Sequence, residues 1–182
     1  MESDPVSRTF ERITKLDAAK RQLRTAIRLF FAEGDPVSIH TLAAASHEVL
    51  RAIAMSRGYR SFLKDSDLIR PEGAKEYYSI VNAPQNFFKH ADRDLDATLD
   101  FKTEWTPFFL FDCAVMYKSL TGRDFRESWV FAMWFTLKYP RILKPGPLRD
   151  SAEKTIAAGT LTKALCLEII EQPEKWPQAN LE

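Results

Sequence analysis

The feature that most constrains the fold is a run of apolar side chains between residues 107 and 117. Its apolar members are Pro107, Phe108, Phe109, Leu110, Phe111, Cys113, Ala114, Val115, Met116 and Tyr117. Thr106 and Pro107 suit the cap and first turn of a helix, and Gly122 suits its end. A helix that is apolar nearly all round must be surrounded by other elements. The run therefore predicts the central helix of a bundle.

Asp112 is the single charged residue inside that run. An isolated carboxylate is costly to bury, so it must be paired, protonated or placed at a cavity if it lies inside the bundle. The alternative is that Asp112 occupies the one exposed strip of its helix. Both interpretations remain open from the sequence.

Other segments carry apolar side chains at the spacing of three and four that lines one helix face. They are residues 16–31, 36–53, 72–81, 124–139 and 150–171. A chain of 182 residues with 45% apolar residues has the material for one buried core. We therefore predict an all-α, single-domain bundle of five or six helices over residues 1–171, followed by a proline-containing tail, residues 172–182.

Glycine and proline mark the helix ends. Gly34 suits a left-handed position after the first helix, while Asp35 and Pro36 suit the cap and first turn of the next. Pro84 lacks a backbone N–H and restricts the residue before it, so we predict a break at which the helix either kinks or ends and restarts near Asn82. Residues 98–102 alternate in polarity but are too isolated to form a sheet.

The charge balance excludes a simple electrostatic argument for binding. Lys and Arg number 26 and Asp and Glu number 25, so nucleic-acid binding would require a local patch. No apolar run approaches the roughly 20 residues that cross a bilayer, so we expect no membrane association. Cys113 and Cys166 lie in apolar helical patterns, as small buried thiols do, which favours a reduced, cytoplasmic protein.

Residues 86–94 are unusual because two phenylalanines run directly into ionisable groups. If Pro84 starts a new helical segment, Asn86 and His90 are four residues apart and address a common partner. His90 is suited to proton transfer near neutral pH, and Lys89 or Arg93 to stabilising phosphate charge. The run predicts the wall of a pocket or cleft.

A second polar stripe lies on the helix of residues 36–53, where His40, His47 and Arg51 flank the apolar face beside Glu48. It is either a functional constellation or a pair of histidines bonded to backbone or water. Histidines and carboxylates provide ligands for a divalent metal, but their spacing matches no closed pattern, so no metal or other cofactor is expected.

The stretch from Asn86 to His90, set in an all-helical bundle, resembles the small HEPN-type domains of prokaryotes. Many of these are RNases that dimerise to bring together two motifs in which Arg precedes His by four to six residues. Ala83, Pro84 and Gln85 stand where that Arg would be, so only His90 matches the motif fully. The resemblance implies RNA or nucleotide binding and a homodimer.

The predicted function is HEPN-like nucleic-acid or nucleotide binding, extending to a metal-independent RNase centred on His90. The candidate catalytic residues are His90, Asn86 and Lys89, and the candidate binding residues are Arg93, Asp92, Asp94, His40, His47, Glu48 and Asp112. Two alternatives stay open: a metal-dependent helical hydrolase that uses the three histidines and acidic residues, and a non-enzymatic protein-interaction module. The sequence leaves open whether the protein is an enzyme.

Overall fold

A computed structural model describes residues 10–67, 69–90, 94–147, 149–150, 153–154, 161–172 and 174. Its elements are α1 (Lys15–Phe31), α2 (Pro36–Ser56), α3 (Pro71–Lys89), η1 (Thr103–Trp105), α4 (Thr106–Thr121), α5 (Arg126–Lys138), η2 (Pro140–Ile142) and α7 (Lys163–Glu171). No strand occurs within these ranges. The predicted all-α bundle is confirmed.

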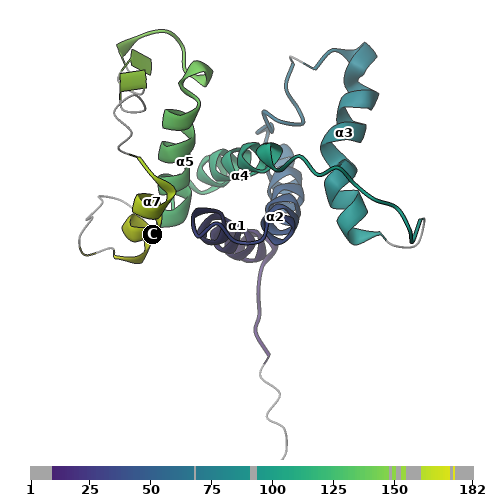
Figure 1. The fold of residues 1–182 in the computed structure, drawn as a ribbon, viewed down its shortest axis with the longest axis horizontal. Helices are drawn as coiled ribbons and strands as arrows, with labels where there is room; N and C mark the ends of the chain where they lie inside the picture. The colour runs from purple at the N-terminus through teal and green to yellow at the C-terminus, as the bar shows by residue number, and fades with distance from the viewer. Residues whose placement is uncertain are drawn as a thin grey trace, which may run out of the picture.

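Three helices form the centre of the bundle and two groups flank it. Helix α2 packs against both α1 and α4, and α4 also packs against α5. Figure 1 shows α5 and α7 on one side of this centre and α3 on the opposite side, beside α2. The predicted central helix is therefore α4, which shares the centre with α2.

The core is rich in aromatic side chains contributed by α1, α4 and α5. The bulkiest of the completely buried side chains are Phe31, Phe109, Phe131, Phe135 and Phe125, the N-cap residue of α5. The rings of Phe111 and Phe135 stack with centroids 4.3 Å apart. Cys113 and Cys166 are buried free thiols, and burial raises the pKa of Cys166 to about 12. Both cysteines thus serve as small apolar side chains.

The link between α1 and α2 follows the prediction in one respect and departs from it in another. Asp35 caps α2 by accepting a hydrogen bond from the backbone N–H of Ser38, and Pro36 is the first helical residue. The left-handed residue is Glu33, with φ of 54°, and not Gly34. Gly34 is needed for close approach, because a Cβ there would lie 3.3 Å from the Leu29 carbonyl oxygen.

The predicted end and restart of the helix near Pro84 is wrong, since α3 continues through this residue to Lys89. Pro84 still removes the hydrogen bond to the carbonyl of Ile80, but the Ile80 side chain is 56% exposed and its turn is open to water. Val81 and Gln85, on either side of Pro84, are both buried. Their packing holds the two turns in one helix.

Candidate functional site

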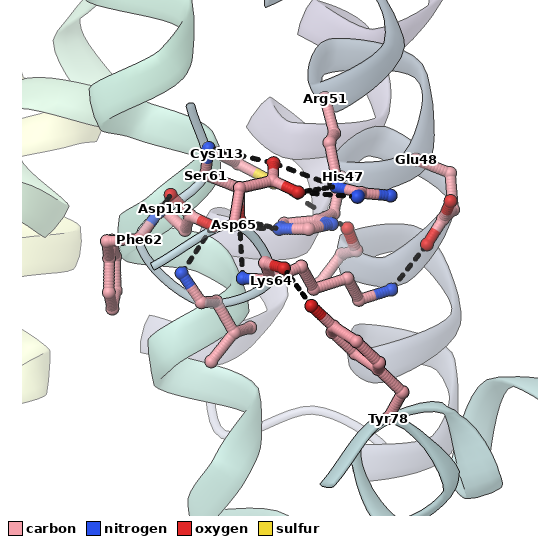
Figure 2. A network of polar contacts seen from close by, with 12 residues as sticks. His47, Glu48, Arg51, Ser61, Phe62, Lys64, Asp65, Tyr78, Asp112 and Cys113 are labelled. Atoms are coloured by element: carbon pink, nitrogen blue, oxygen red, sulfur yellow. Dashed lines mark hydrogen bonds and ion pairs between the residues drawn. The ribbon is translucent and has the colours of Figure 1, made fainter. Parts of the chain in front are cut away.

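Asp112 lies at the middle of α4 and is completely buried. Its Oδ2 atom lies 2.8 Å from Nε2 of His47 on α2 and also accepts a hydrogen bond from the hydroxyl of Ser61. The backbone N–H groups of Phe62 and Leu63 donate to its two carboxylate oxygens at 3.2 and 3.3 Å. Of the two alternatives for Asp112, the buried and paired one is therefore confirmed, and the carboxylate holds the α2–α3 loop against the core (Figure 2).

Ser61, His47 and Asp112 include the residue types of a hydrolytic triad, but their arrangement differs. In such a triad the imidazole lies between the serine and the carboxylate. Here a single imidazole nitrogen, Nε2 of His47, lies 2.8 Å from Oδ2 of Asp112 and 3.4 Å from the Ser61 hydroxyl oxygen, and the hydroxyl itself donates to Asp112. All three residues are fully buried, and the Ser61 hydroxyl also accepts from the Lys64 N–H at 2.9 Å. The cluster ties α2, the loop and α4 together.

A second carboxylate fixes the same loop from outside the core. Asp65 accepts a hydrogen bond from the backbone N–H of Ser61 at 3.1 Å and binds the guanidinium of Arg51 through Nε and Nη2. Burial raises the pKa of Asp65, but the hydrogen bonds from Arg51 and Ser61 outweigh it and hold the pKa below its usual range. Two carboxylates, Asp112 and Asp65, thus hold the loop in place. Lys64 belongs to this loop, and its position is fixed with it.

Lys64 is a buried lysine with a defined set of contacts. Its side chain is 3% exposed, and its ammonium lies 2.5 Å from Oε1 of Glu48 on α2. The ammonium also lies 5.5 Å from the centroid of the Phe109 ring. The hydroxyl of Tyr78, on α3, donates to the Lys64 carbonyl at 2.7 Å (Figure 2). These contacts therefore fix the Lys64 ammonium beside Glu48.

Lys64 opens onto a polar pocket between α2, the loop and α3, which we call the α2–α3 pocket. Its volume is about 330 Å³, and its lining residues are Glu48, Arg51, Lys64, Tyr78, Asn82, Gln85 and Asn86. Gln85 is 7% exposed, and its Nε2 atom donates to Oδ1 of Asn82 at 3.2 Å. Its Oε1 atom has no hydrogen-bond partner within the described part of the chain. A buried acceptor in this state favours a ligand that donates an N–H or O–H.

The predicted site residues that the structure describes fall into three groups. Asn86 and Glu48 line the α2–α3 pocket, as does Arg51 from the predicted polar stripe. Lys89, His90 and Asp94 are exposed at and beyond the end of α3. Asp92 and Arg93 lie outside the described residues. His40, His47 and Asp112 are fully buried between helices.

His40 lies in an aromatic cage and not at a boundary. Its Nδ1 atom is 3.0 Å from the hydroxyl of Thr106, and its ring packs edge-on against Phe88, Phe101 and Phe109. Burial, aided by the positive charge of Lys64, lowers the pKa of His40 to about 4. His40 is therefore neutral at physiological pH and serves as a core residue.

The buried His40 predicts a pH dependence of stability. Between the ordinary histidine pKa of 6.5 and the folded value of about 4, the unfolded chain binds a proton that the folded protein excludes. The free energy of unfolding should therefore fall as the pH decreases through this range, by about 3 kcal/mol at its lower end. Urea denaturation of the parent and of His40→Gln across this range measures the effect. Parallel curves for the two proteins would contradict it.

The buried histidines do not form a metal centre with acidic residues. Among the described residues, no group of three or more His, Cys, Asp and Glu side chains has an arrangement that would hold a metal ion. His40 bonds to Thr106 and His47 bonds to Asp112, so the two imidazoles address different partners. The alternative of a metal-dependent hydrolase gains no support from this geometry.

Sequence reasoning missed most of the pocket. It assigned no chemistry to residues 57–71, yet this loop supplies Ser61, Lys64 and Asp65. Asn82 and Gln85 were also missed, although they precede Asn86 by four residues and one residue on the same helix. Helical spacing from Asn86 was the one signal that pointed to Asn82.

No helix in the described part of the chain combines the length and the apolarity needed to cross a membrane. Comparison of the chain with models of protein families, with curated proteins and with solved structures finds no match.

Proposed function

We propose that this protein binds nucleotides or single-stranded RNA through the α2–α3 pocket. The observation that carries the proposal is the combination of a buried ammonium, from Lys64, and a buried amide with an unpartnered oxygen, from Gln85, in one open pocket. A ligand that satisfies both must present an anionic or carbonyl oxygen together with an N–H or O–H donor. Nucleotides have both kinds of group.

The amides in the pocket suit the polar edge of a base. Asn82, Gln85 and Asn86 provide donors and acceptors on successive turns of α3. Asparagine and glutamine amides pair with base edges through two hydrogen bonds, and single-stranded nucleic acids expose these edges. The pocket volume of about 330 Å³ is at the lower end of the range for small-molecule sites.

The cations in the pocket suit a phosphate. Lys64 is held at the inner wall, and Arg51 lines the pocket with a guanidinium that Asp65 orients. Beyond Asn86, α3 exposes Phe87, Lys89 and His90, an aromatic ring followed by two basic side chains. Stacking on aromatic rings and contact with cations are the two elements of single-strand binding. The pocket and the end of α3 thus form one continuous proposed surface.

RNA cleavage is the catalytic extension of this proposal and would be centred on His90. An imidazole exposed at the end of α3 is accessible to a bound strand, and it transfers protons without a metal. His90 is the C-cap residue of α3, its backbone N–H donates to the carbonyl of Asn86, and Asn86 lines the pocket. The basis of this extension is the resemblance of residues 86–90 to the HEPN-type motif, of which this chain has the His and lacks the Arg.

The binding proposal predicts that Asn86→Ala weakens affinity for a labelled single-stranded RNA by about three- to tenfold, the effect of one neutral hydrogen bond. Fluorescence anisotropy at fixed salt measures it. Ser79→Ala is the matched control, because Ser79 is an exposed polar residue of α3 outside the pocket and should leave the affinity unchanged. His90→Ala should lose any chelator-insensitive cleavage of the labelled RNA. Absence of binding to RNA and to nucleoside monophosphates by the parent protein would refute the proposed function.

A further inference from the structure

The ion pair between Lys64 and Glu48 is unequal in burial and in restraint. The side chain of Lys64 is 3% exposed, while that of Glu48 is 42% exposed. The backbone of Lys64 is held at both ends, since its N–H donates to Ser61 at 2.9 Å and its carbonyl accepts from Tyr78 at 2.7 Å. Lys64 is therefore the more buried and more restrained partner of the pair, and Glu48 is the more exposed one.

The carboxylate of Glu48 occupies a position with several donors. It accepts hydrogen bonds from the Lys64 ammonium and from the side-chain amide of Gln85. Burial raises the pKa of Glu48, but the hydrogen bond and charge of Lys64 outweigh it, so the net shift is downward and the group is a carboxylate at neutral pH. The position of Glu48 Oε1 is therefore a built anion site that the protein fills with its own side chain.

Further donors stand beside this position. Arg51 lies one turn after Glu48 on α2 and also lines the pocket. Its bonds to Asp65 use Nε and Nη2, which leaves Nη1 without a hydrogen bond to the described residues. A phosphate has more acceptor oxygens than a carboxylate, so it can accept hydrogen bonds from Lys64, Gln85 and Arg51 at the same time. Among the described residues, the Glu48 carboxylate accepts only from Lys64 and Gln85.

We infer that Glu48 is an internal counter-ion that a phosphate group of the ligand displaces from Lys64. The inference rests on the proposed function. It identifies the phosphate as the part of the ligand that contacts the buried ammonium directly. While the pocket is empty, Glu48 neutralises Lys64, which would otherwise be an uncompensated buried charge. When ligand binds, the half-exposed Glu48 side chain turns to solvent and the phosphate takes its place. Ligands without an anionic group leave Glu48 where it is.

The displacement makes Glu48 a competitor of the ligand, so its removal should strengthen phosphate binding. Glu48→Gln is expected to lower the Kd for inorganic phosphate and for uridine monophosphate about tenfold, and to leave the Kd for uridine unchanged. Isothermal titration calorimetry with these three probes measures the effect. Asp67→Asn is the matched control, because it removes one exposed carboxylate that pairs with Arg60 elsewhere on the same loop. This control should leave all three affinities unchanged.

The outcomes separate the inference from the proposed function. Unchanged or weaker phosphate binding by Glu48→Gln overturns the counter-ion role, even if nucleotides bind to the parent. An equal gain in Asp67→Asn overturns it too, because the effect would then come from net charge. A gain for inorganic phosphate without any binding of nucleotides or RNA supports the counter-ion role and refutes the proposed function.

If Glu48→Gln does not fold, Glu48→Asp provides a second test. It retains the charge on a shorter side chain and should tighten phosphate binding about threefold; no gain there overturns the inference.

Discussion

Replacement of Asp112 by alanine should lower the free energy of unfolding by about 3–5 kcal/mol, the cost of removing one partner from a buried charged cluster. Four donors converge on this carboxylate, from His47, Ser61, Phe62 and Leu63. After the change they would remain inside the protein without an acceptor. Urea denaturation followed by circular dichroism measures the loss.

Two variants make the Asp112 result specific. Asp112→Asn retains one acceptor oxygen but turns an amide N–H toward donor groups, so it should be destabilised less than Asp112→Ala. Asp67→Ala removes an exposed carboxylate from the same loop and should change the free energy by less than about 0.5 kcal/mol. A loss below about 1 kcal/mol for Asp112→Ala would mean that the carboxylate does not clamp the loop.

Replacement of Lys64 by methionine should weaken binding of a phosphate-bearing ligand by about ten- to a hundredfold, the range for loss of a charge-assisted hydrogen bond. Stability should be retained, because methionine fills a similar volume against the Phe109 ring and the former partner, Glu48, is exposed enough to be hydrated. Titration of uridine monophosphate into both proteins measures the affinity, and thermal denaturation measures stability.

Lys75→Met provides the control for Lys64→Met. Lys75 is an exposed lysine of α3 outside the pocket, so its loss removes the same charge without changing the pocket. Both affinity and stability should match those of the parent. Equal binding by Lys64→Met and the parent would remove the buried ammonium from the proposed site and place any phosphate contact at the exposed end of α3.

The helices were largely readable from the sequence, because each buries a stripe of side chains with helical spacing. The apolar run around Phe109 identified α4 as central, and Asp35 with Pro36 marked the start of α2. Pro84 was misjudged, because a local rule about one missing hydrogen bond does not include the packing of Val81 and Gln85 against the bundle. The left-handed position was assigned to Gly34 but is occupied by Glu33. This error has a similar cause, since the close approach of Gly34 to Leu29 cannot be read from the local sequence.

The candidate site was readable only in part. Asp112 stood out because a charge within an apolar helix requires a partner, and the structure provides that partner as His47. Asn86 stood out beside a run of charges and lines the pocket. Nothing in residues 57–71 distinguished Ser61 or Lys64 from ordinary loop residues, since Ser61 is buried against Asp112 of α4, and Lys64 contacts Glu48 of α2 and the Phe109 ring of α4.

The sequence by itself determined the class of fold, the central place of α4 and the need of Asp112 for a partner, because periodicity and the cost of burying charge act along one helix. The tertiary structure decided which groups donate hydrogen bonds to the Asp112 carboxylate. It also decided that Lys64, a loop residue, is buried with its ammonium paired to Glu48. These contacts join residues separated by 16 to 65 positions. They form only when α2, the α2–α3 loop and α4 pack together, so no local pattern encodes them.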